Sequence, residues 1–264
     1  MSPTQPGGPD VPVDVLVALP AHDEAETICG CLDAVVAALT TARHAGVVAR
    51  ARVAVAAHRC ADATRERALA RLVGLPGIES LVREDVADVP VGAVRTRLIR
   101  SAIDLPEPLS RDAWILSTDA DTVVPADWVT GLLAAARASH ADLVLGLAEL
   151  DHWAADEPAR QAYARLIADG IRGDQHEHVY AANLAVSWSA FDRVGGFPAV
   201  RHGEEHALVR AVRAAGLGVV SPLGPRVTTS ARMPGRAASG LGELLERLAG
   251  RTVDPPVGRG SAQA

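Results

Sequence analysis

An alternation of continuous apolar runs with helix-forming stretches constrains the fold of this chain more than any other feature of its sequence. The apolar runs cover residues 13–19, 47–57 and 114–118. The helix-forming stretches cover residues 25–42, 62–72 and 128–138, and in the first of them Ile28, Leu32, Val35 and Leu39 recur at helical spacing. Strands that are apolar along their whole length are buried on both faces, and parallel strands need a long crossover, usually a helix, to connect them. The pattern therefore predicts an α/β fold, with a central, mostly parallel sheet flanked by helices on both sides.

The length and composition favour one domain with two halves. With 264 residues, of which 48% are hydrophobic, the chain can bury a large single core. The alternation weakens after a predicted strand at 141–147, and the following segment is richer in His, Asp and Glu. Further on, the patterns predict a helix at 205–215, a short strand at 218–221 and a helix at 241–248. We predict a single domain over residues 13–250, with halves at 13–148 and 149–250 and flexible tails at 1–12 and 251–264.

The charge balance and the lack of targeting signals argue against several classes of protein. The formal net charge is −6 and the sequence has no lysine, so no basic field is available for a nucleic-acid backbone or an anionic membrane surface. No apolar run approaches the roughly 20 residues of a membrane helix, and the first residues do not resemble a signal peptide. The three cysteines lack a metal-binding spacing and are predicted to be reduced. We expect a soluble, cytoplasmic protein with no nucleic-acid partner and no transmembrane segment.

Two carboxylates, Asp119 and Asp121, directly follow the predicted strand at 114–118. In an open parallel sheet, ligands bind outside the carboxyl ends of the strands. Alternate residues of an extended segment point to the same side, so both carboxylates can bind one hard divalent ion, Mg or Mn, and leave positions for phosphate oxygens. An isolated Asp-x-Asp also occurs as a turn that ends a strand. The helix-forming stretch that follows favours a nucleotide-binding edge of the sheet instead.

Several short motifs occur in a fixed order along the chain. Residues 15–24 read VLVALPAHDE, and the Asp119–Asp121 motif comes next. Residues 183–186 read NLAV, residues 191–197 read FDRVGGF and residues 203–208 read GEEHAL. In this order they resemble the nucleotide loop, the Asp-x-Asp motif, the acceptor loop and the Glu-Asp motif of the family 2 glycosyltransferases, which have the GT-A fold. The resemblance spans about residues 13–240.

The resemblance implies an enzyme that transfers a hexose from a nucleotide-diphosphate sugar to a hydroxyl acceptor, with inversion at the anomeric carbon. Donor contacts would come from Pro20, Ala21, Asp23, Glu24, His58, Asp62, Arg95 and Asp119, and the metal ligands would be Asp119 and Asp121. Acceptor contacts would come from His178, Asn183 and Glu204, with Glu205 as the catalytic base and Arg232 at the departing diphosphate. Residues 13–148 would form the nucleotide-sugar-binding half and residues 149–250 the acceptor half.

Two departures from the family pattern leave alternatives open. Residues 57–60 read AHRC where many members have DDGS, so the donor base stays open, with His58 as the replacement contact. Glu205 stands where Asp is commonest, which retains a carboxylate. A nucleotide-sugar-binding protein without catalysis and a retaining GT-A transferase are the alternatives. Without the family context, Glu204 and Glu205 would be ordinary acidic residues in the first turn of a helix. A nucleotidyltransferase is disfavoured because residues 20–24 are not a glycine-rich, basic loop.

Overall fold

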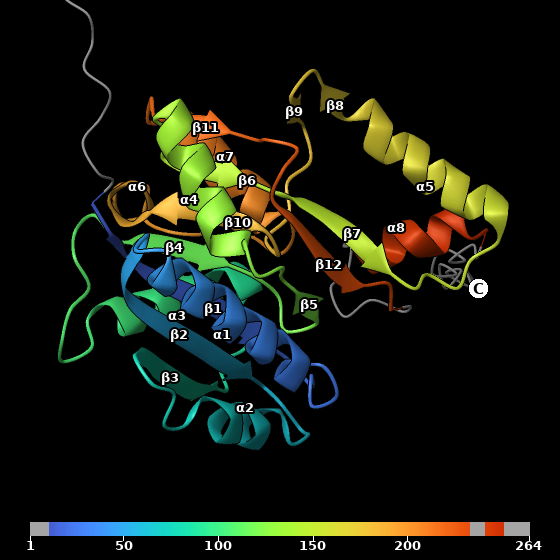
Figure 1. Cartoon of the computed structure of the whole chain (residues 1–264). Coiled ribbons are helices and arrows are strands. Elements are labelled where there is room, and N and C mark those ends of the chain that lie inside the picture. The colour runs from blue at the N-terminus through green and yellow to red at the C-terminus, as the bar shows by residue number, and fades with distance from the viewer. Residues whose placement is uncertain (1–10, 233–240, 251–264) are drawn as a thin grey trace, which may run out of the picture.

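The computed structural model describes residues 11–232 and 241–250, in three sheets and eight helices (Figure 1). The strands are β1 (Val13–Ala21), β2 (Val48–His58), β3 (Ile78–Asp85), β4 (Trp114–Ser117), β5 (Thr122–Val123), β6 (Leu143–Leu145), β7 (Leu147–Asp151), β8 (Ile171–Arg172), β9 (Gln175–His176), β10 (Leu184–Ser187), β11 (Val219–Val220) and β12 (Arg226–Ser230). The helices are α1 (Ile28–His44), α2 (Thr64–Leu72), α3 (Val91–Ile103), α4 (Trp128–Ser139), α5 (Glu157–Asp169), α6 (Trp188–Arg193), α7 (Glu204–Ala214) and α8 (Leu241–Leu248). The predicted tail at 251–264, and residues 1–10 of the other tail, lie outside the described residues.

The large sheet is mostly parallel, as the alternation predicted. Its seven strands follow the order β11-β6-β10-β4-β1-β2-β3, and only β10 runs antiparallel to its neighbours among these described strands. In register, Val17 of β1 lies beside Val53 of β2 and Leu116 of β4. The carboxyl ends of these three strands therefore share one edge of the sheet, and the polar residues that follow each strand are brought together there.

The strand β1 is buried on both faces. Val15, Val17 and Leu19 belong to a core that includes residues of α1, α2 and α4. Leu16 and Ala18 point the other way, into a core shared with α3, α6 and α7. Each fully buried Val or Leu contributes about 1.5–3 kcal/mol, so this doubly covered strand holds the sheet edge in a fixed position.

The strand predicted at 141–147 is in fact two strands that separate at Gly146. A Cβ atom at Gly146 would lie 2.2 Å from Nδ2 of Asn183, which is fully buried. The same Nδ2 donates a hydrogen bond of 2.8 Å to the carbonyl oxygen of Leu147. β6 therefore joins the large sheet, whereas β7 leaves it and pairs with β12.

A three-stranded sheet, β5-β12-β7, extends from the end of the central strands. Thr122 of β5 and Thr229 of β12 are joined by a hydrogen bond of 3.0 Å between their hydroxyl groups. Beyond this sheet, α5 and α8 pack on one another at the end of the molecule through a small core around Trp153, Ala159 and Leu245 (Figure 1). Among the described residues, no helix combines the length and the apolar character needed to span a membrane.

Candidate active site

A cavity of about 950 Å³ opens at the edge of the sheet where β1 and β4 end. Residues from both halves of the chain line it. Of the predicted site residues, the lining includes Pro20, Glu24, His58, Arg95, Asp119, Asp121, Glu204, Glu205 and Arg232. The sequence therefore identified the core of this cavity from segments that lie far apart along the chain.

The loop after β1 is held by the loop after β2. The backbone N–H of Glu24 donates to Oγ1 of Thr64 at 2.7 Å, and that of Ala25 donates to Oδ2 of Asp62 at 2.9 Å. Oδ1 of Asp23 accepts a hydrogen bond of 2.7 Å from the backbone of Ala61. These contacts direct the Glu24 carboxylate, with a side chain only 10% exposed, into the cavity.

Asp119 follows β4 and is paired with the buried Arg95 of α3. Arg95 also donates a hydrogen bond of 2.7 Å to Oγ of Ser117, the last residue of β4. Its guanidinium lies 5.8 Å from the centre of the Phe197 ring, within reach of a cation–π contact. Arg95 therefore fixes the end of β4 and keeps a positive charge beside the first carboxylate of the motif.

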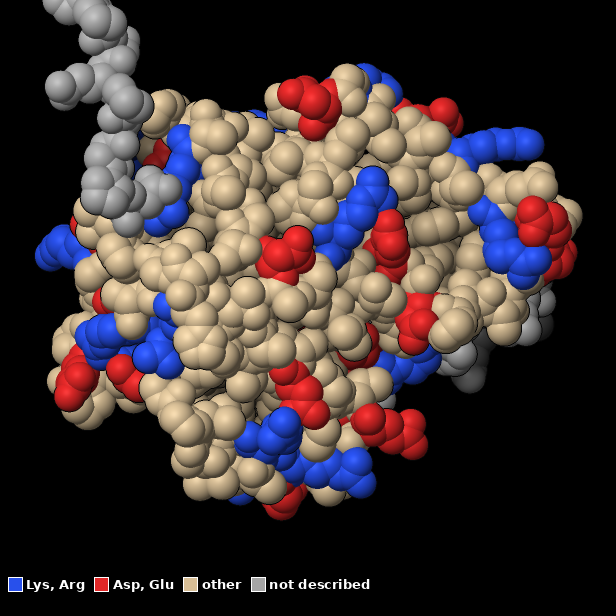
Figure 2. Space-filling view, in the orientation of Figure 1, with Lys and Arg blue, Asp and Glu red and all other residues tan. Residues whose placement is uncertain are grey.

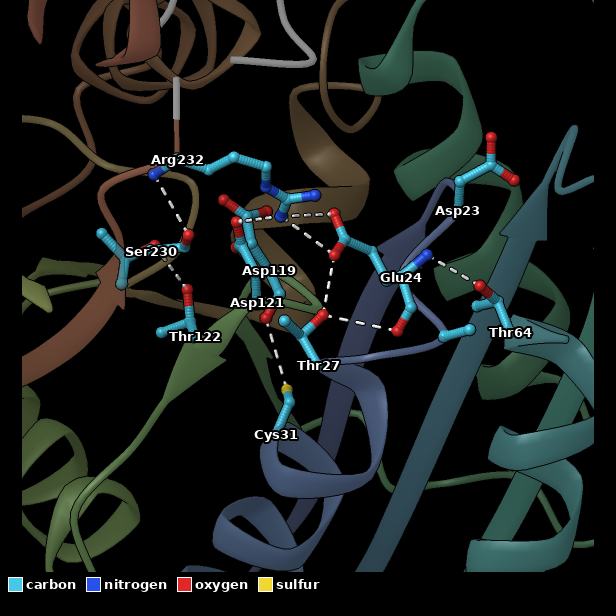
Figure 3. A network of polar contacts seen from close by, with 12 residues as sticks. Asp23, Glu24, Thr27, Cys31, Thr64, Asp119, Asp121, Thr122, Ser230 and Arg232 are labelled. Carbon is cyan, nitrogen blue, oxygen red and sulfur yellow. Dashed lines mark hydrogen bonds and ion pairs between the residues drawn. The ribbon is translucent and has the colours of Figure 1, made fainter. Parts of the chain in front are cut away.

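Asp121 lies close to the carboxylates of Asp119 and Glu24, beyond the carboxyl end of β4 (Figure 3). Burial, together with repulsion from Asp119 and Glu24, raises the pKa of Asp121 to about 6. The opposing positive charge comes from Arg232, whose Nη2 lies 3.0 Å from Oδ2 of Asp121 and 3.0 Å from Oε2 of Glu24. The pairing of β5 with β12 carries Arg232 to this position, because Arg232 follows β12 by two residues.

The residues at this position fit a hard divalent cation. Glu24, Asp119 and Asp121 offer only carboxylate oxygens, which are the ligands that Mg²⁺ and Mn²⁺ prefer. Burial raises the pKa of Asp121 and repulsion from Asp119 and Glu24 raises it further, and a cation would relieve that repulsion. A second acidic group, formed by Asp23, Cys60 and Asp62, brings three ligand atoms within 4.8 Å of one another. Its two carboxylates already accept backbone hydrogen bonds from the adjoining loops.

Glu204 and Glu205 begin α7, line the same cavity and differ in their surroundings. Glu204 is buried, its Oε1 lies 3.8 Å from Nε of Arg95, and burial raises its pKa against the attraction of Arg95. The Glu205 side chain is 19% exposed, and its Oε1 lies 3.2 Å from Nδ1 of His206. Glu204 is thus part of the Arg95 and Asp119 network, whereas Glu205 lines the cavity beside His206.

The end of β2 contributes His58 and Arg59 to the cavity wall. Burial lowers the pKa of His58, although Asp85 lies close, with Oδ1 3.8 Å from Nδ1 of the ring. His22 from the first loop lies beside it, with 6.4 Å between the ring centres, and a ring nitrogen of His22 lies 2.8 Å from the His58 carbonyl oxygen. This wall contains ring and guanidinium groups in the region where many family 2 members have acidic residues.

Five of the predicted contact residues do not line the cavity: Ala21, Asp23, Asp62, His178 and Asn183. Ala21 is a buried end of β1, while Asp23 and Asp62 join the two loops. Asn183 lies wholly inside the core, where its Oδ1 accepts a hydrogen bond of 2.9 Å from Nε1 of Trp128. His178 packs against Gly170, and its Nε2 lies 2.9 Å from the carbonyl oxygen of Ile167. In this structure, the contacts of these side chains hold other parts of the chain in place.

The sequence did not single out several residues that complete the cavity. They are Arg59, Tyr180, Arg201 and Arg247, together with Leu241 and Leu244 of α8. The lining includes five arginines and five carboxylates, so the formal charges of these side chains balance. An arginine in a surface loop carries no sequence signal that separates it from a solvated one. On the face drawn in Figure 2, the arginines and carboxylates are interspersed.

A mostly parallel sheet with two carboxylates after a central strand, facing acidic residues at a helix start, is the arrangement of the GT-A nucleotide-diphospho-sugar transferase fold. Solved structures with this fold superpose on the chain. A mannosyltransferase from Pyrobaculum calidifontis, in complex with GDP-Man and Mn²⁺, gives a TM-score of 0.62 at 15% identity over 86% of this chain. S. aureus TarS, in complex with UDP-GlcNAc, gives 0.58 at 10% identity over 90%. GalNAc-T7, with UDP, GalNAc and Mn²⁺, gives 0.61 at 12% identity over 89%.

These likenesses establish that the chain has the GT-A fold. The chain spans 60% of the length of the mannosyltransferase, 66% of the TarS chain and 47% of GalNAc-T7. No protein-family model matches the sequence, and no curated protein sequence matches it.

Proposed function

We propose that this chain is an inverting, metal-dependent glycosyltransferase that moves a hexose from a nucleotide-diphosphate sugar to a hydroxyl acceptor. The observation that carries the proposal is the cavity lined by Asp119 and Asp121, which follow β4, and by Glu205 at the start of α7. The neighbours of similar fold bind GDP-Man, UDP-GlcNAc or UDP, and two of them bind Mn²⁺. The motif order supports a place in family 2.

In this proposal the two halves of the chain bind different substrates. Residues 13–148 would bind the nucleotide sugar, with Glu24, His58 and Arg95 at the donor, and residues 149–250 would bind the acceptor. Asp119 and Asp121 would hold Mg²⁺ or Mn²⁺, which stabilises the negative charge on a departing diphosphate. Arg232 would contact the same phosphates, because a guanidinium can donate two hydrogen bonds to phosphate oxygens.

Glu205 is proposed as the base of the transfer. The acceptor hydroxyl oxygen forms the new bond to the anomeric carbon while the bond to the diphosphate breaks, and the hydroxyl proton passes to the Glu205 carboxylate. In this mechanism the acceptor, on the Glu205 side, attacks from the face opposite the diphosphate held at Asp119 and Asp121. The anomeric configuration is inverted, and a product of retained configuration would contradict this mechanism.

A thermal-shift series tests the proposal. The protein is melted with GDP-, UDP- and TDP-sugars, each with and without MnCl₂. A ligand at about 100 times its dissociation constant stabilises the native state by about 2.7 kcal/mol, which raises the melting midpoint measurably. We expect at least one nucleotide sugar to stabilise the protein only when Mn²⁺ is present. Slow release of free sugar from that donor then separates an enzyme from a protein that only binds it.

A further inference from the structure

The guanidinium of Arg232 lies where a metal ion bound by Glu24 and Asp121 would lie. Its Nη2 lies 3.1 Å from Oε1 and 3.0 Å from Oε2 of Glu24, and 3.0 Å from Oδ2 of Asp121 (Figure 3). One nitrogen therefore contacts three carboxylate oxygens, supplied by the loops after β1 and β4. A hard metal ion is bound in proteins by such a group of oxygens.

A positive charge at this point stabilises the carboxylates of Glu24 and Asp121. The side chains of Glu24 and Asp121 are only 10% and 22% exposed, so water compensates their charges poorly. Arg232 is 31% exposed and lines the cavity, so its guanidinium has solvent-facing space into which it can withdraw. The contact of Arg232 with the two carboxylates is thus stabilising, and Arg232 can still move away from them.

Arg232 and a divalent ion compete for Oδ2 of Asp121 in this arrangement. A metal ion lies about 2.0–2.6 Å from its oxygen ligands, and Nη2 already lies 3.0 Å from Oδ2. Two cations that contact the same carboxylate oxygen would lie close together and repel each other. A diphosphate gives the guanidinium another anionic partner within the same cavity, to which it can donate bidentate hydrogen bonds.

We propose that Arg232 is a positioning residue that occupies the metal position until a nucleotide diphosphate draws it away, so that metal and donor bind together. The proposal rests on the proposed function for the identity of that anion. Metal binding and nucleotide binding are then coupled, and each strengthens the other by the same factor. Mn²⁺ alone binds weakly to the free protein.

Titration of the full chain with MnCl₂ tests this, with free Mn²⁺ followed by electron paramagnetic resonance. The titration is done alone, with GDP and with UDP, on the wild type, Arg232→Met and Arg226→Met. Arg226 is the matched control, because it also comes from β12 and pairs with a carboxylate, Glu149, outside the cavity. We expect Arg232→Met to bind Mn²⁺ alone about tenfold more tightly than the wild type, since a charge-assisted competitor has been removed. The gain from nucleotide should shrink in this variant, and Arg226→Met should match the wild type.

Equal or weaker Mn²⁺ binding by Arg232→Met would overturn the proposal, because the guanidinium would then support the site and not compete for it. If this variant does not fold, as judged by its melting curve, Arg232→Lys serves instead. The affinity of Arg232→Lys for Mn²⁺ alone should also exceed that of the wild type.

Failure of the proposed function would give a different result in the same titration. In that case neither GDP nor UDP changes Mn²⁺ binding to the wild type, while Arg232→Met still gains affinity for the metal alone. That result would show that a nucleotide diphosphate does not displace Arg232. It would still support competition between Arg232 and the metal ion for the carboxylates.

Discussion

Two neighbouring glutamates at the start of α7 have different surroundings. Glu204 lies against Gly92 and near Arg95, so closely that a Cβ at Gly92 would lie 2.9 Å from Cβ of Glu204. Glu205 is more exposed and has His206 as its neighbour. Glu204 holds the arginine that holds Asp119, and Glu205 is free of that network. A substitution at each position should therefore produce a distinct defect.

We predict that Glu205→Gln reduces transfer, or slow donor hydrolysis, by about 10²–10⁴-fold, since the amide keeps the shape of the side chain but cannot accept the proton. Donor affinity and the midpoint of thermal unfolding should stay near the wild-type values. Turnover is measured with the donor found by thermal shift. Glu204→Gln is the comparison, and it should lower donor affinity because Arg95 loses a charged neighbour. Equal, small effects of both substitutions on turnover would show that Glu205 is not the base.

We predict that Asp121→Asn removes the Mn²⁺-dependent part of donor binding. Changes to groups that only orient metal ligands reduce metal affinity by about 10–100-fold, so loss of a direct ligand should cost at least that much. Calorimetric titration of the nucleotide with and without Mn²⁺ measures the difference. Asp127→Asn is the control, because Asp127 is exposed and lies outside the cavity. Mn²⁺-dependent affinity at the wild-type level in Asp121→Asn would remove Asp121 from the metal site.

Sequence analysis located the site residues that directly follow a predicted strand or begin a predicted helix. Asp119 and Asp121 follow a buried strand, and Glu204 and Glu205 begin a helix, so their positions could be predicted from local patterns. Asn183 belongs to a motif of the resemblance, yet its amide lies in the core between Trp128 and Leu147. Which groups a buried amide meets depends on segments distant in sequence, and no local pattern encodes that.

At the level of elements, Gly146 divides one apolar run into two strands of different sheets. The run at 141–147 has no polar residue at the break, so its composition indicates one strand. The break results from the approach of Asn183, 37 residues further along the chain, to a position without a side chain. Likewise β3 is an edge strand in which only Ile78 and Asp85 are buried, and α5 buries only Ala159, so neither has the apolar periodicity that sequence analysis detects.

We predict that Gly146→Ala lowers the free energy of unfolding by about 1–3 kcal/mol, because the new methyl group would overlap an amide fixed by three hydrogen bonds. Urea denaturation measures the change. Gly30→Ala is the matched control, since Gly30 is exposed within α1 and has no atom within 4 Å of the added Cβ. It should raise stability by about 0.4–1 kcal/mol. A neutral Gly146→Ala would show that Asn183 can move, and that the division of the strand has another cause.

For the whole molecule, stability at low pH depends in part on Asp85 at the end of β3. Burial by itself raises the pKa of Asp85, but hydrogen bonds from Arg97 and from the backbone of Ala87 more than offset this, and the net pKa is lowered. A lowered pKa in the folded state means that the contribution to stability is present above the unfolded value of about 4. It is lost as the pH falls through the folded value.

We predict that Asp85→Asn is less stable than the wild type near pH 7, and that this difference shrinks as the pH falls below about 4. Urea denaturation at several pH values measures it. Asp88→Asn is the control, because Asp88 is 90% exposed in its pair with Arg59 and should change stability little at any pH. A difference between Asp85→Asn and the wild type that does not vary with pH would contradict the assignment.

The contact between Arg232 and the two carboxylates also sets an order of events during synthesis. Arg232 is 208 residues from Glu24 and 111 residues from Asp121 along the chain. At about 5–20 residues per second, the ribosome needs roughly 6–22 s to add the 111 residues between Asp121 and Arg232. The first half of the sheet can begin to fold in that time, with both carboxylates in place and their arginine not yet made.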